Sequence, residues 1–307
     1  MGTPELASTS LGALLQASGL AVVAVVTQPD RPKGRELKLH ASPVKELALQ
    51  AGVPVLQPQR AREEQFMEQV RAVNPDLIAV AAYGQILPQT LLDVPRFGCL
   101  NVHTSLLPKY RGAAPITWAI LNDEATTGVT IMKMNAGLDT GDIVAQETTP
   151  VYETDDCRIL HDRLAELGAS LLVRTIPPYT TGRAQPYPQP PEAISYARKI
   201  TKSDGRIDWT QPARTAWNRV RGLIPWPGAF TFLPASPKPL LLKIWKAEVD
   251  NRTGAPGEVL LADKSGILVG CGHGSLRLLL VQPEGSRQMT AQDFLAGHGL
   301  GNGQRLG

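Results

Sequence analysis

Two patterns of apolar and polar positions alternate along the first half of the chain. Short, fully apolar runs predict buried strands, and apolar residues spaced three or four apart predict helices. The predicted strands span 21–27, 53–56, 76–82, 100–103, 129–134 and 142–146, and the predicted helices span 4–19, 43–52, 63–73 and 156–173. Alternation of this kind predicts an α/β fold with a Rossmann-like, mostly parallel sheet covered by helices on both faces.

The last third of the chain consists of shorter β-prone runs separated by turns. Predicted strands lie at 229–233, 240–249, 257–261, 266–270 and 275–281, with helical stretches at 213–221 and 290–295. Five short strands of this spacing suit a small β-barrel.

A proline-rich stretch separates the part in which strands and helices alternate from the β-rich part. Six prolines lie between Pro177 and Pro191, which predicts an extended and stiff connector. The helix before it carries a leucine stripe that closes the first domain. The stripe consists of Leu160, Leu164, Leu167 and Leu171. We therefore divide the chain into a domain at 1–176, a linker at 177–203 and a domain at 204–307.

Composition is that of a globular protein. With 307 residues and 43% hydrophobic content, one large or two ordinary domains are expected. The three cysteines are far apart, which favours neither a disulfide framework nor a zinc site and predicts a reducing compartment. No apolar run reaches the roughly 18 residues of a membrane span, and no signal peptide is recognisable. We expect a cytoplasmic, monomeric protein without a membrane partner.

Charge is distributed unevenly. Residues 192–307 hold 15 Lys and Arg against 9 Asp and Glu, whereas residues 1–191 hold 16 against 19. The formal net charge of the C-terminal part is therefore +6, and that of the rest of the chain is −3. This asymmetry indicates either a polyanionic partner for the C-terminal part or an ordinary solvated basic face.

The candidate catalytic residues lie near the end of the predicted strand at 100–103. Side chains alternate along a strand, so Asn101 and His103 project from one side about 7 Å apart. Asp139 lies in a Gly-flanked loop that can turn back on them. An amide donor, an imidazole and a carboxylate suit acyl-type transfer to an amine. The alternative is a hydrogen-bonded histidine at a strand end without a catalytic role.

Three stretches around these residues resemble the signature of the folate-dependent formyltransferases, and the resemblance runs from Gly2 to near the C-terminus. They are Asn101-Val-His103, Ser105-Leu-Leu-Pro-Lys-Tyr-Arg-Gly-Ala-Ala-Pro115 and Gly128-Val-Thr-Ile-Met-Lys-Met-Asn-Ala-Gly-Leu-Asp-Thr-Gly-Asp142. The resemblance implies an OB-like C-terminal barrel that helps to hold tRNA.

The resemblance also implies a reaction. 10-Formyltetrahydrofolate would donate its formyl group to the α-amine of methionine esterified to initiator tRNA. Asn101 and His103 would donate to the oxyanion, and Asp139 would orient or ionise His103 and assist proton removal; which of the two takes the proton stays open. The family's folate-contacting loop corresponds to Ser105, Leu106, Leu107 and Pro108. No metal is expected, because the remaining histidines are scattered.

A basic stretch between a predicted strand and a predicted helix is the candidate tRNA contact. Residues 31–45 carry five Lys or Arg against one Glu. Such a run is usually solvated surface, but long ordered loops are often functional. In the resembling family the corresponding loop enters the acceptor end of initiator tRNA. The residues assigned to this contact are Arg31, Lys33, Arg35 and Lys38, with Arg35 as the main position.

Three other functions compete with this interpretation. The first is a formyltransferase of the same fold that acts on a nucleotide-sugar amine or on glycinamide ribonucleotide. The second is a tRNA-binding protein without catalysis. The third is a dinucleotide-dependent enzyme, which the absence of a G-x-G-x-x-G motif after Gly2-Thr-Pro-Glu5 disfavours.

One expectation concerns the sheet itself. Met1-Gly-Thr-Pro-Glu5 begins at the turn that follows an opening strand in doubly wound sheets. That strand lies in the interior of such sheets, so its absence would leave an apolar slot between two neighbours. We therefore expect the natural protein to start upstream of Met1; the alternative is a start at Met1 with a rearranged sheet.

Overall fold

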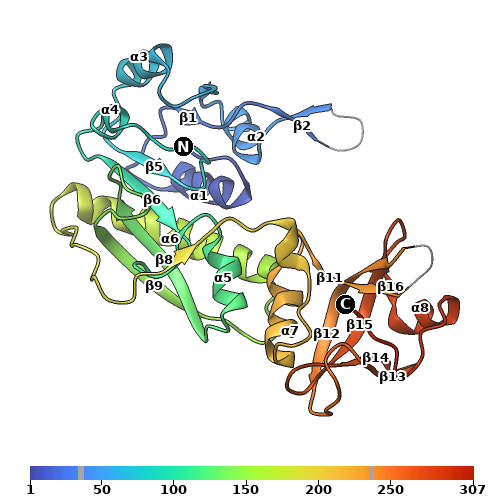
Figure 1. Cartoon of the computed structure of the whole chain (residues 1–307). Helices are drawn as coiled ribbons and strands as arrows, with labels where there is room; N and C mark the ends of the chain where they lie inside the picture. Colours follow the sequence, from blue (N-terminus) through green and yellow to red (C-terminus); the bar gives the residue numbers. More distant parts are fainter. Residues whose placement is uncertain (34–37, 235–237) are drawn as a thin grey trace. The chain divides into compact units, whose positions relative to one another are not determined.

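The computed structural model describes residues 1–33, 38–234 and 238–307 and divides the chain into two compact units (Figure 1). Unit 1 contains Met1–Pro115, Thr126–Pro150 and His161–Ala197. Unit 2 contains Ile116–Ala125, Val151–Leu160 and Arg198–Gly307. Two short segments that precede residue 161 thus belong to the same compact unit as the C-terminal third.

The sheet of unit 1 is in two pieces. One piece has the order β5 (Ile78–Val80), β6 (Cys99–His103), β8 (Thr126–Lys133) and β9 (Ile143–Pro150). The other pairs β1 (Val25–Val26) in parallel with β4 (Val55–Leu56). β5 and β6 are parallel, but β8 runs antiparallel to both β6 and β9. The predicted mostly parallel sheet is therefore mixed, and the chain reverses direction after the strand that carries Asn101 and His103.

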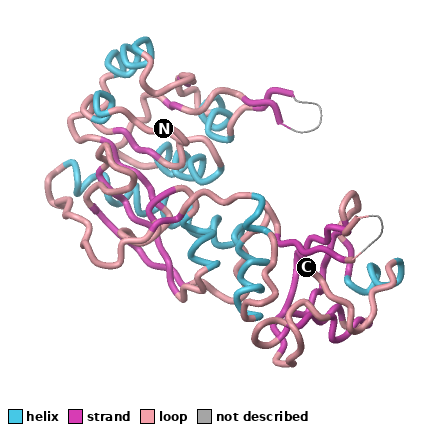
Figure 2. Tube along the Cα trace, in the orientation of Figure 1, coloured by secondary structure: helices cyan, strands magenta, loops and turns pink. Residues whose placement is uncertain are grey.

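Helices cover this sheet, as the alternation predicts (Figure 2). They are α1 (Glu5–Gln16), α2 (Pro43–Gln50), α3 (Glu64–Val73), α4 (Gln89–Leu92) and α6 (Cys157–Thr180). Ser42 caps α2 by accepting the N–H of Lys45 at 3.1 Å. In the leucine stripe of α6, Leu160 and Leu164 are fully buried, as expected of a core-facing helix.

Several predicted boundaries are wrong. The predicted strand 21–27 shrinks to β1, because residues 20–24 have no neighbouring strand to pair with in the described chain. Helix α6 runs through Pro177 and Pro178 to Thr180. Its last turn persists because the hydroxyls of Thr180 and Thr181 donate to preceding carbonyls. Helix α5 (Pro115–Leu121) was not predicted.

The proline-rich connector is not a free extended segment after α6. β10 (Tyr196–Ala197) pairs in parallel with β7 (Arg111–Gly112), and Tyr187 forms a bridge with Ile143 of β9. The hydroxyl of Ser195 also accepts the N–H of Tyr110 at 2.9 Å. This stretch therefore packs on unit 1 next to the end of β6.

The basic stretch is not a loop throughout. β2 (Arg31–Lys33) and β3 (Lys38–His40) form an antiparallel hairpin, with Arg31 opposite His40 and Lys33 opposite Lys38. Figure 1 shows the hairpin projecting beyond α2. Arg35 lies outside the described residues.

Unit 2 contains a six-stranded antiparallel sheet. Its order is β11 (Ala229–Leu233), β12 (Leu240–Asp250), β15 (Ser275–Pro283), β14 (Gly266–Gly270) and β13 (Val259–Asp263), with β16 (Met289–Thr290) on β15. Helices η1 (Lys202–Gly205), α7 (Ala213–Gly222) and α8 (Ala291–Gly297) also belong to the unit. β11 and β14 have the predicted bounds, whereas β16 was not predicted.

Residues 303–307 join the two outer strands of this sheet. Phe232 of β11 exchanges backbone hydrogen bonds with Gly307 at 2.8 and 3.0 Å. Val259 of β13 donates to Gln304 and accepts from Gly303, both at 2.8 Å. The end segment thus connects β11 with β13, which gives the sheet a barrel-like closure through backbone hydrogen bonds.

Buried polar contacts fasten α7 within unit 2. The guanidinium of Arg221 is 8% exposed and donates to the carbonyls of Tyr152 and Asp155 at 3.0 and 3.2 Å. Arg214 pairs with Asp123 at 2.8 Å, and both arginines contact the ring of Trp217. Segments 116–125 and 151–160 are therefore held against α7. In the described part of the chain, no helix is long and apolar enough to cross a membrane.

Candidate active site

β6 carries two of the three candidate catalytic residues at its end. Its burial pattern leaves Asn101 partly exposed while His103 is 6% exposed. Asn101 lies opposite Met132 and His103 opposite Thr130 on β8. Because the two residues are separated by one position, the strand presents both side chains on the same face, as predicted.

Asp139 reaches the same place from the loop between β8 and β9. Its Oδ2 lies 3.8 Å from Nδ1 of His103 and accepts the backbone N–H of Gly112 at 2.7 Å. The carboxylate is only 14% exposed. The structure therefore brings Asp139 and His103 together, and it anchors the carboxylate more closely to the backbone of β7 than to the imidazole.

The backbone around Asp139 is tightly constrained. Asp139 has φ +50°, a left-handed conformation that costs a non-glycine residue free energy unless its surroundings hold it. Two residues later, a Cβ at Gly141 would lie 1.8 Å from the carbonyl oxygen of Lys133. Glycine at this position allows the loop to pass close to the end of β8 and return toward His103.

The two ring nitrogens of His103 have different surroundings. Nε2 lies 3.0 Å from the carbonyl oxygen of Tyr110, and a carbonyl can only accept, so Nε2 carries a hydrogen and donates. In the neutral ring this leaves Nδ1 without a proton, facing Asp139. A proton that arrives at Nδ1 creates an imidazolium beside a carboxylate, which stabilises it. The site can thus accept a proton at Nδ1.

Gln189 is a site residue that the sequence did not indicate. Its Nε2 donates to the carbonyls of Asp139 and Gly141, both at 2.8 Å. Its Oε1 accepts from Nε and Nη2 of the buried Arg111 at 3.0 and 2.6 Å. Gln189 belongs to the proline-rich stretch, far from both partners in sequence and outside any motif. Only the fold reveals that it clamps the Asp139 loop.

The predicted folate-contacting residues form a turn whose side chains mostly face inward. Ser105 is fully buried, and its hydroxyl donates to the carbonyl of Lys109 at 2.6 Å. Leu107 is 3% exposed, and Pro108 is buried as well. Leu106 alone among the four is partly exposed. The turn therefore offers a ligand its backbone and Leu106 rather than four side chains.

Thr130 holds this turn in place. Its hydroxyl donates to the carbonyl of Ser105 at 2.7 Å and accepts the N–H of Leu107 at 3.0 Å. Gln146 of β9 adds a hydrogen bond to the carbonyl of Leu107 at 2.9 Å. The turn is thus preorganised by the neighbouring strands.

The predicted tRNA-contacting residues are not in contact with the three catalytic candidates in the described part of the chain. Arg31 donates to Oε1 of Gln28 at 3.2 Å and lines a hollow of about 460 Å³ beside the start of α1. The backbones of Lys33 and Lys38 are paired in the register of the hairpin. Across the described ranges, no three His, Cys, Asp or Glu side chains are grouped as a metal site requires.

Comparison with protein families matches both parts of the chain. The family described as "Formyl transferase" matches residues 1–176. The family described as "Formyl transferase, C-terminal domain" matches residues 199–299. Together these two matches span most of the sequence.

Curated relatives resemble the chain over its full length. A methionyl-tRNA formyltransferase of Trichlorobacter lovleyi is 50% identical over 306 residues, which cover all of this chain and 95% of the relative. A methionyl-tRNA formyltransferase of Caldanaerobacter subterraneus subsp. tengcongensis is 49% identical over 309 residues, which cover all of this chain and 98% of the relative. The resemblance therefore includes the site and both units.

Solved structures share the fold at lower identity. An N-formyltransferase of Helicobacter canadensis, in complex with folinic acid and dTDP-3-aminofucose, superimposes with a TM-score of 0.64 at 18% identity. The match covers 90% of this chain and 97% of that structure. At this identity the similarity extends to the fold alone.

Proposed function

The chain belongs to the formyl transferase family, and from that premise we propose that it formylates methionyl-initiator tRNA with 10-formyltetrahydrofolate as donor. The observation that carries the proposal is full-length identity of about one half to methionyl-tRNA formyltransferases. Asn101, His103 and Asp139, assembled at the end of β6, supply suitable chemistry. The product would support initiation of translation.

The reaction requires a free α-amine. Its nitrogen attacks the formyl carbon, a C–N bond forms, and the carbonyl oxygen becomes an oxyanion in a tetrahedral intermediate. We assign the amide of Asn101 as a donor to this oxyanion. The bond from the formyl carbon to the folate nitrogen then breaks, and the proton lost by the amine goes to that departing nitrogen.

We assign His103 and Asp139 to the transfer of the amine proton. In the neutral ring Nε2 donates to Tyr110, so Nδ1 takes the amine proton and Asp139 stabilises the imidazolium. The protonated Nδ1 can then act as a second donor to the oxyanion before it passes the proton to the departing folate nitrogen. This keeps His103 in the donor role expected from the resemblance and adds the role of base.

The two substrates are assigned to different surfaces. The donor's pterin is placed at the turn of Ser105, Leu106, Leu107 and Pro108, with contacts to the turn's backbone and to Leu106. The acceptor end of tRNA is placed at the hairpin that carries Arg31, Lys33 and Lys38, and the proposal includes Arg35, which lies outside the described residues. Residues 1–176 would carry the transfer, and residues 204–307 would add electrostatic affinity for tRNA.

A formyl-transfer assay with purified protein tests the proposal. 10-Formyltetrahydrofolate is offered with methionyl-initiator tRNA, with uncharged initiator tRNA or with a dTDP-amino sugar, and formylated product is measured. We expect turnover with the first acceptor only. Preference for the amino sugar would replace the proposed function with sugar formylation. Binding of tRNA without turnover of any acceptor would favour a non-catalytic tRNA-binding protein.

A further inference from the structure

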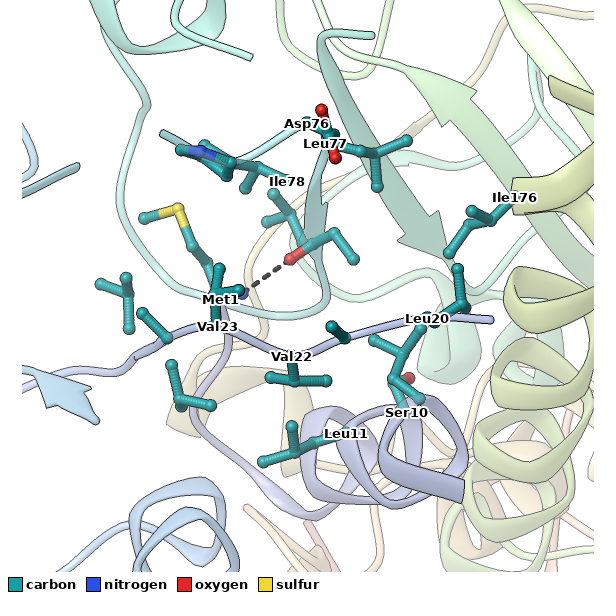
Figure 3. A pocket seen from close by; sticks show the side chains of 18 of the residues that line it. Met1, Ser10, Leu11, Leu20, Val22, Val23, Asp76, Leu77, Ile78 and Ile176 are labelled. Carbon is teal, nitrogen blue, oxygen red and sulfur yellow. Dashed lines mark hydrogen bonds between the residues drawn. The ribbon is translucent and has the colours of Figure 1, made fainter. Parts of the chain in front are cut away.

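The loop that carries Asp139 begins and ends on a closed pair of strands. The N–H of Lys133 donates to the carbonyl of Asp142 at 2.8 Å, where β8 and β9 meet at the base of the loop. A cavity of about 650 Å³ lies elsewhere in unit 1, and Figure 3 shows it between residues 22–23 and 77–78. Among the described residues that line this cavity, none belongs to β8, β9 or their loop. The support of the loop therefore has to be sought in its own contacts.

The side-chain oxygen of Asn135 accepts two hydrogen bonds from within this loop. Its Oδ1 accepts the backbone N–H of Gly137 at 3.0 Å and the hydroxyl of Thr140 at 2.8 Å. The first bond makes an Asx-turn, in which a side chain accepts from the backbone two residues later. Gly137 precedes Asp139 in the sequence and Thr140 follows it. One oxygen atom thus ties together both ends of the segment that carries the carboxylate.

Glycine at position 137 leaves the room that this turn requires. A Cβ at Gly137 would lie 2.1 Å from Oγ1 of Thr140 and 3.3 Å from Oδ1 of Asn135. Carbon and oxygen atoms that are not bonded to each other do not approach to the first distance, so a side chain there would push the Thr140 hydroxyl away from its acceptor. The turn therefore depends on all three residues.

Asp139 needs such support because its backbone is left-handed, with φ +50°, a conformation that persists only where the surroundings hold it. Gln189 holds the carbonyl of Asp139 at 2.8 Å from one side of the loop. Asn135 restrains the residues on both sides of Asp139 from within the loop. From the backbone that they hold, Oδ2 of Asp139 reaches the N–H of Gly112 at 2.7 Å and lies 3.8 Å from Nδ1 of His103.

We propose that Asn135 is a positioning residue, which holds the Asp139 carboxylate beside His103 through the turn that it closes. Its catalytic consequence rests on the proposed function, whereas its structural consequence can be measured without turnover. Only the acceptor oxygen is required, so aspartate can replace Asn135 and alanine cannot. Asn135 is exposed, and exposed hydrogen bonds add little to global stability because water competes for them. The effect of its loss is therefore on the loop and on kcat, not on the melting temperature.

Residue-resolved hydrogen exchange at Gly112 tests the structural consequence. The N–H of Gly112 donates to the Asp139 carboxylate, so its protection reports where that carboxylate lies. Asn135→Ala is expected to speed exchange at Gly112 by about fivefold or more, and Asn135→Asp to leave it within about twofold. The internal control is the N–H of Ala113, which donates to the carbonyl of Ala197 at 2.8 Å and should exchange equally in all three proteins.

Steady-state formyl transfer tests the catalytic consequence. Asn135→Ala is expected to lower kcat about tenfold while KM for either substrate changes little, and Asn135→Asp to retain most of kcat. Thr140→Val, which removes the hydroxyl, should lower kcat as well, whereas Thr140→Ser should retain most of it. In an Asp139→Asn background, Asn135→Ala should have little further effect, because a residue that acts through the carboxylate's charge then has nothing to position.

Two results would overturn this role of Asn135. One is equal exchange at Gly112 in the 307-residue chain and in Asn135→Ala. The other is a loss of kcat in Asn135→Ala that persists undiminished in the Asp139→Asn background, since the residue would then act on the fold in general. A chain that formylates no acceptor at all would overturn the proposed function, and exchange at Gly112 would still decide whether Asn135 holds the carboxylate in place.

Discussion

Asp139 is held by backbone contacts more closely than by His103. Its Oδ2 accepts from Gly112 at 2.7 Å, and its distance to Nδ1 of His103 is 3.8 Å. The hydrogen bond to Gly112 needs only an acceptor oxygen, whereas stabilisation of an imidazolium needs the negative charge. The structural and the proposed chemical contributions of this side chain can therefore be separated by one substitution.

Asp139→Asn is expected to keep the fold and lower kcat by on the order of 10²-fold. Asparagine can still accept from Gly112 but cannot stabilise a proton on His103. Steady-state formyl transfer and thermal unfolding measure the two effects. Asp142→Asn, at an exposed aspartate of the same loop, is the control and is expected to be active. Normal turnover of Asp139→Asn would exclude an essential carboxylate.

Asn101→Ala is expected to reduce kcat by on the order of 10²-fold while tRNA affinity changes little. A donor to the oxyanion acts only when charge develops in the transition state. The measurements are kcat from the transfer assay and Kd for tRNA from filter binding. A large loss of tRNA affinity at unchanged kcat would contradict this role.

Gln189 is a positioning residue in this arrangement. Gln189→Ala removes the donor to the carbonyls of Asp139 and Gly141 and the oxygen that accepts from the Arg111 guanidinium. We expect kcat to fall about tenfold and the pH profile of kcat to change, since the Asp139 loop is no longer held beside His103. Gln185→Ala, which removes an exposed amide from the same stretch, is the matched control. An unchanged kcat and pH profile would show that Gln189 does not position the Asp139 loop for catalysis.

The sequence indicates some site residues better than others for physical reasons. Asn101 and His103 are two positions apart on one strand, and a period of two is enough to place them on one face. For Asp139 the flanking glycines indicate only that the loop can turn back, because loop geometry is not encoded in a repeating pattern. Gln189 contacts Arg111 across 78 positions of sequence, and such a long-range contact leaves no local signal.

Among the helices and strands, α7 is held in place by a buried guanidinium. Arg221 donates to Asn218, Tyr152 and Asp155, so its removal takes away the hydrogen bonds that hold α7 to the segment 152–155. Arg221→Ala is expected to lower the free energy of unfolding by about 2–4 kcal/mol. Urea denaturation measures the change. Arg252→Ala, at an arginine whose side chain is 54% exposed, is the control and should cost far less.

The bounds of a strand or helix can be predicted from the sequence where residues at both of its ends mark a boundary. β14 starts at Gly266 and ends at Gly270, and the apolar run between these glycines defines it. Residues 20–24 are equally apolar, yet a strand exists only when a partner supplies hydrogen bonds. The reversal of β8 likewise depends on which neighbour it joins, and alternation of strands and helices does not encode that choice.

For the whole molecule, the buried amine of Met1 predicts a pH dependence of stability. Its pKa is about 6 in the folded chain and 8.0 when exposed, so between these values the unfolded state binds more protons. The free energy of unfolding of the 307-residue chain should therefore rise by roughly 2–3 kcal/mol from pH 6 to pH 8. Cys99 is the titratable group whose charge affects the pKa of the amine, and burial raises the pKa of its thiol to about 12.

Urea denaturation between pH 5.5 and 8.5 measures this dependence. Histidines also titrate in this range, so the Nα-acetylated protein is the reference that isolates the amine. The difference in unfolding free energy between the two proteins should change with pH and level off above pH 8. Parallel curves would show that the amine is solvated.

The excess positive charge of residues 192–307 predicts a salt-dependent part of tRNA affinity. Removing those residues would disrupt unit 2, because segments 116–125 and 151–160 belong to it. Substitution is the cleaner test. Lys246, Lys264 and Arg287 are exposed, and replacing all three with Ala should weaken tRNA binding and reduce the slope of log Kd against log salt by up to about three. An unchanged slope would assign these charges to ordinary surface.

The backbone bonds of residues 303–307 to β11 and β13 have a consequence for the order of events during synthesis. Every strand that these residues connect is translated before they are. Unit 1 can begin to pack while the ribosome is still at work, since its segments end at Ala197. The outer strands of unit 2 keep unpaired edges until residues 303–307 emerge, so a nascent chain that stalls before them exposes those edges to other chains.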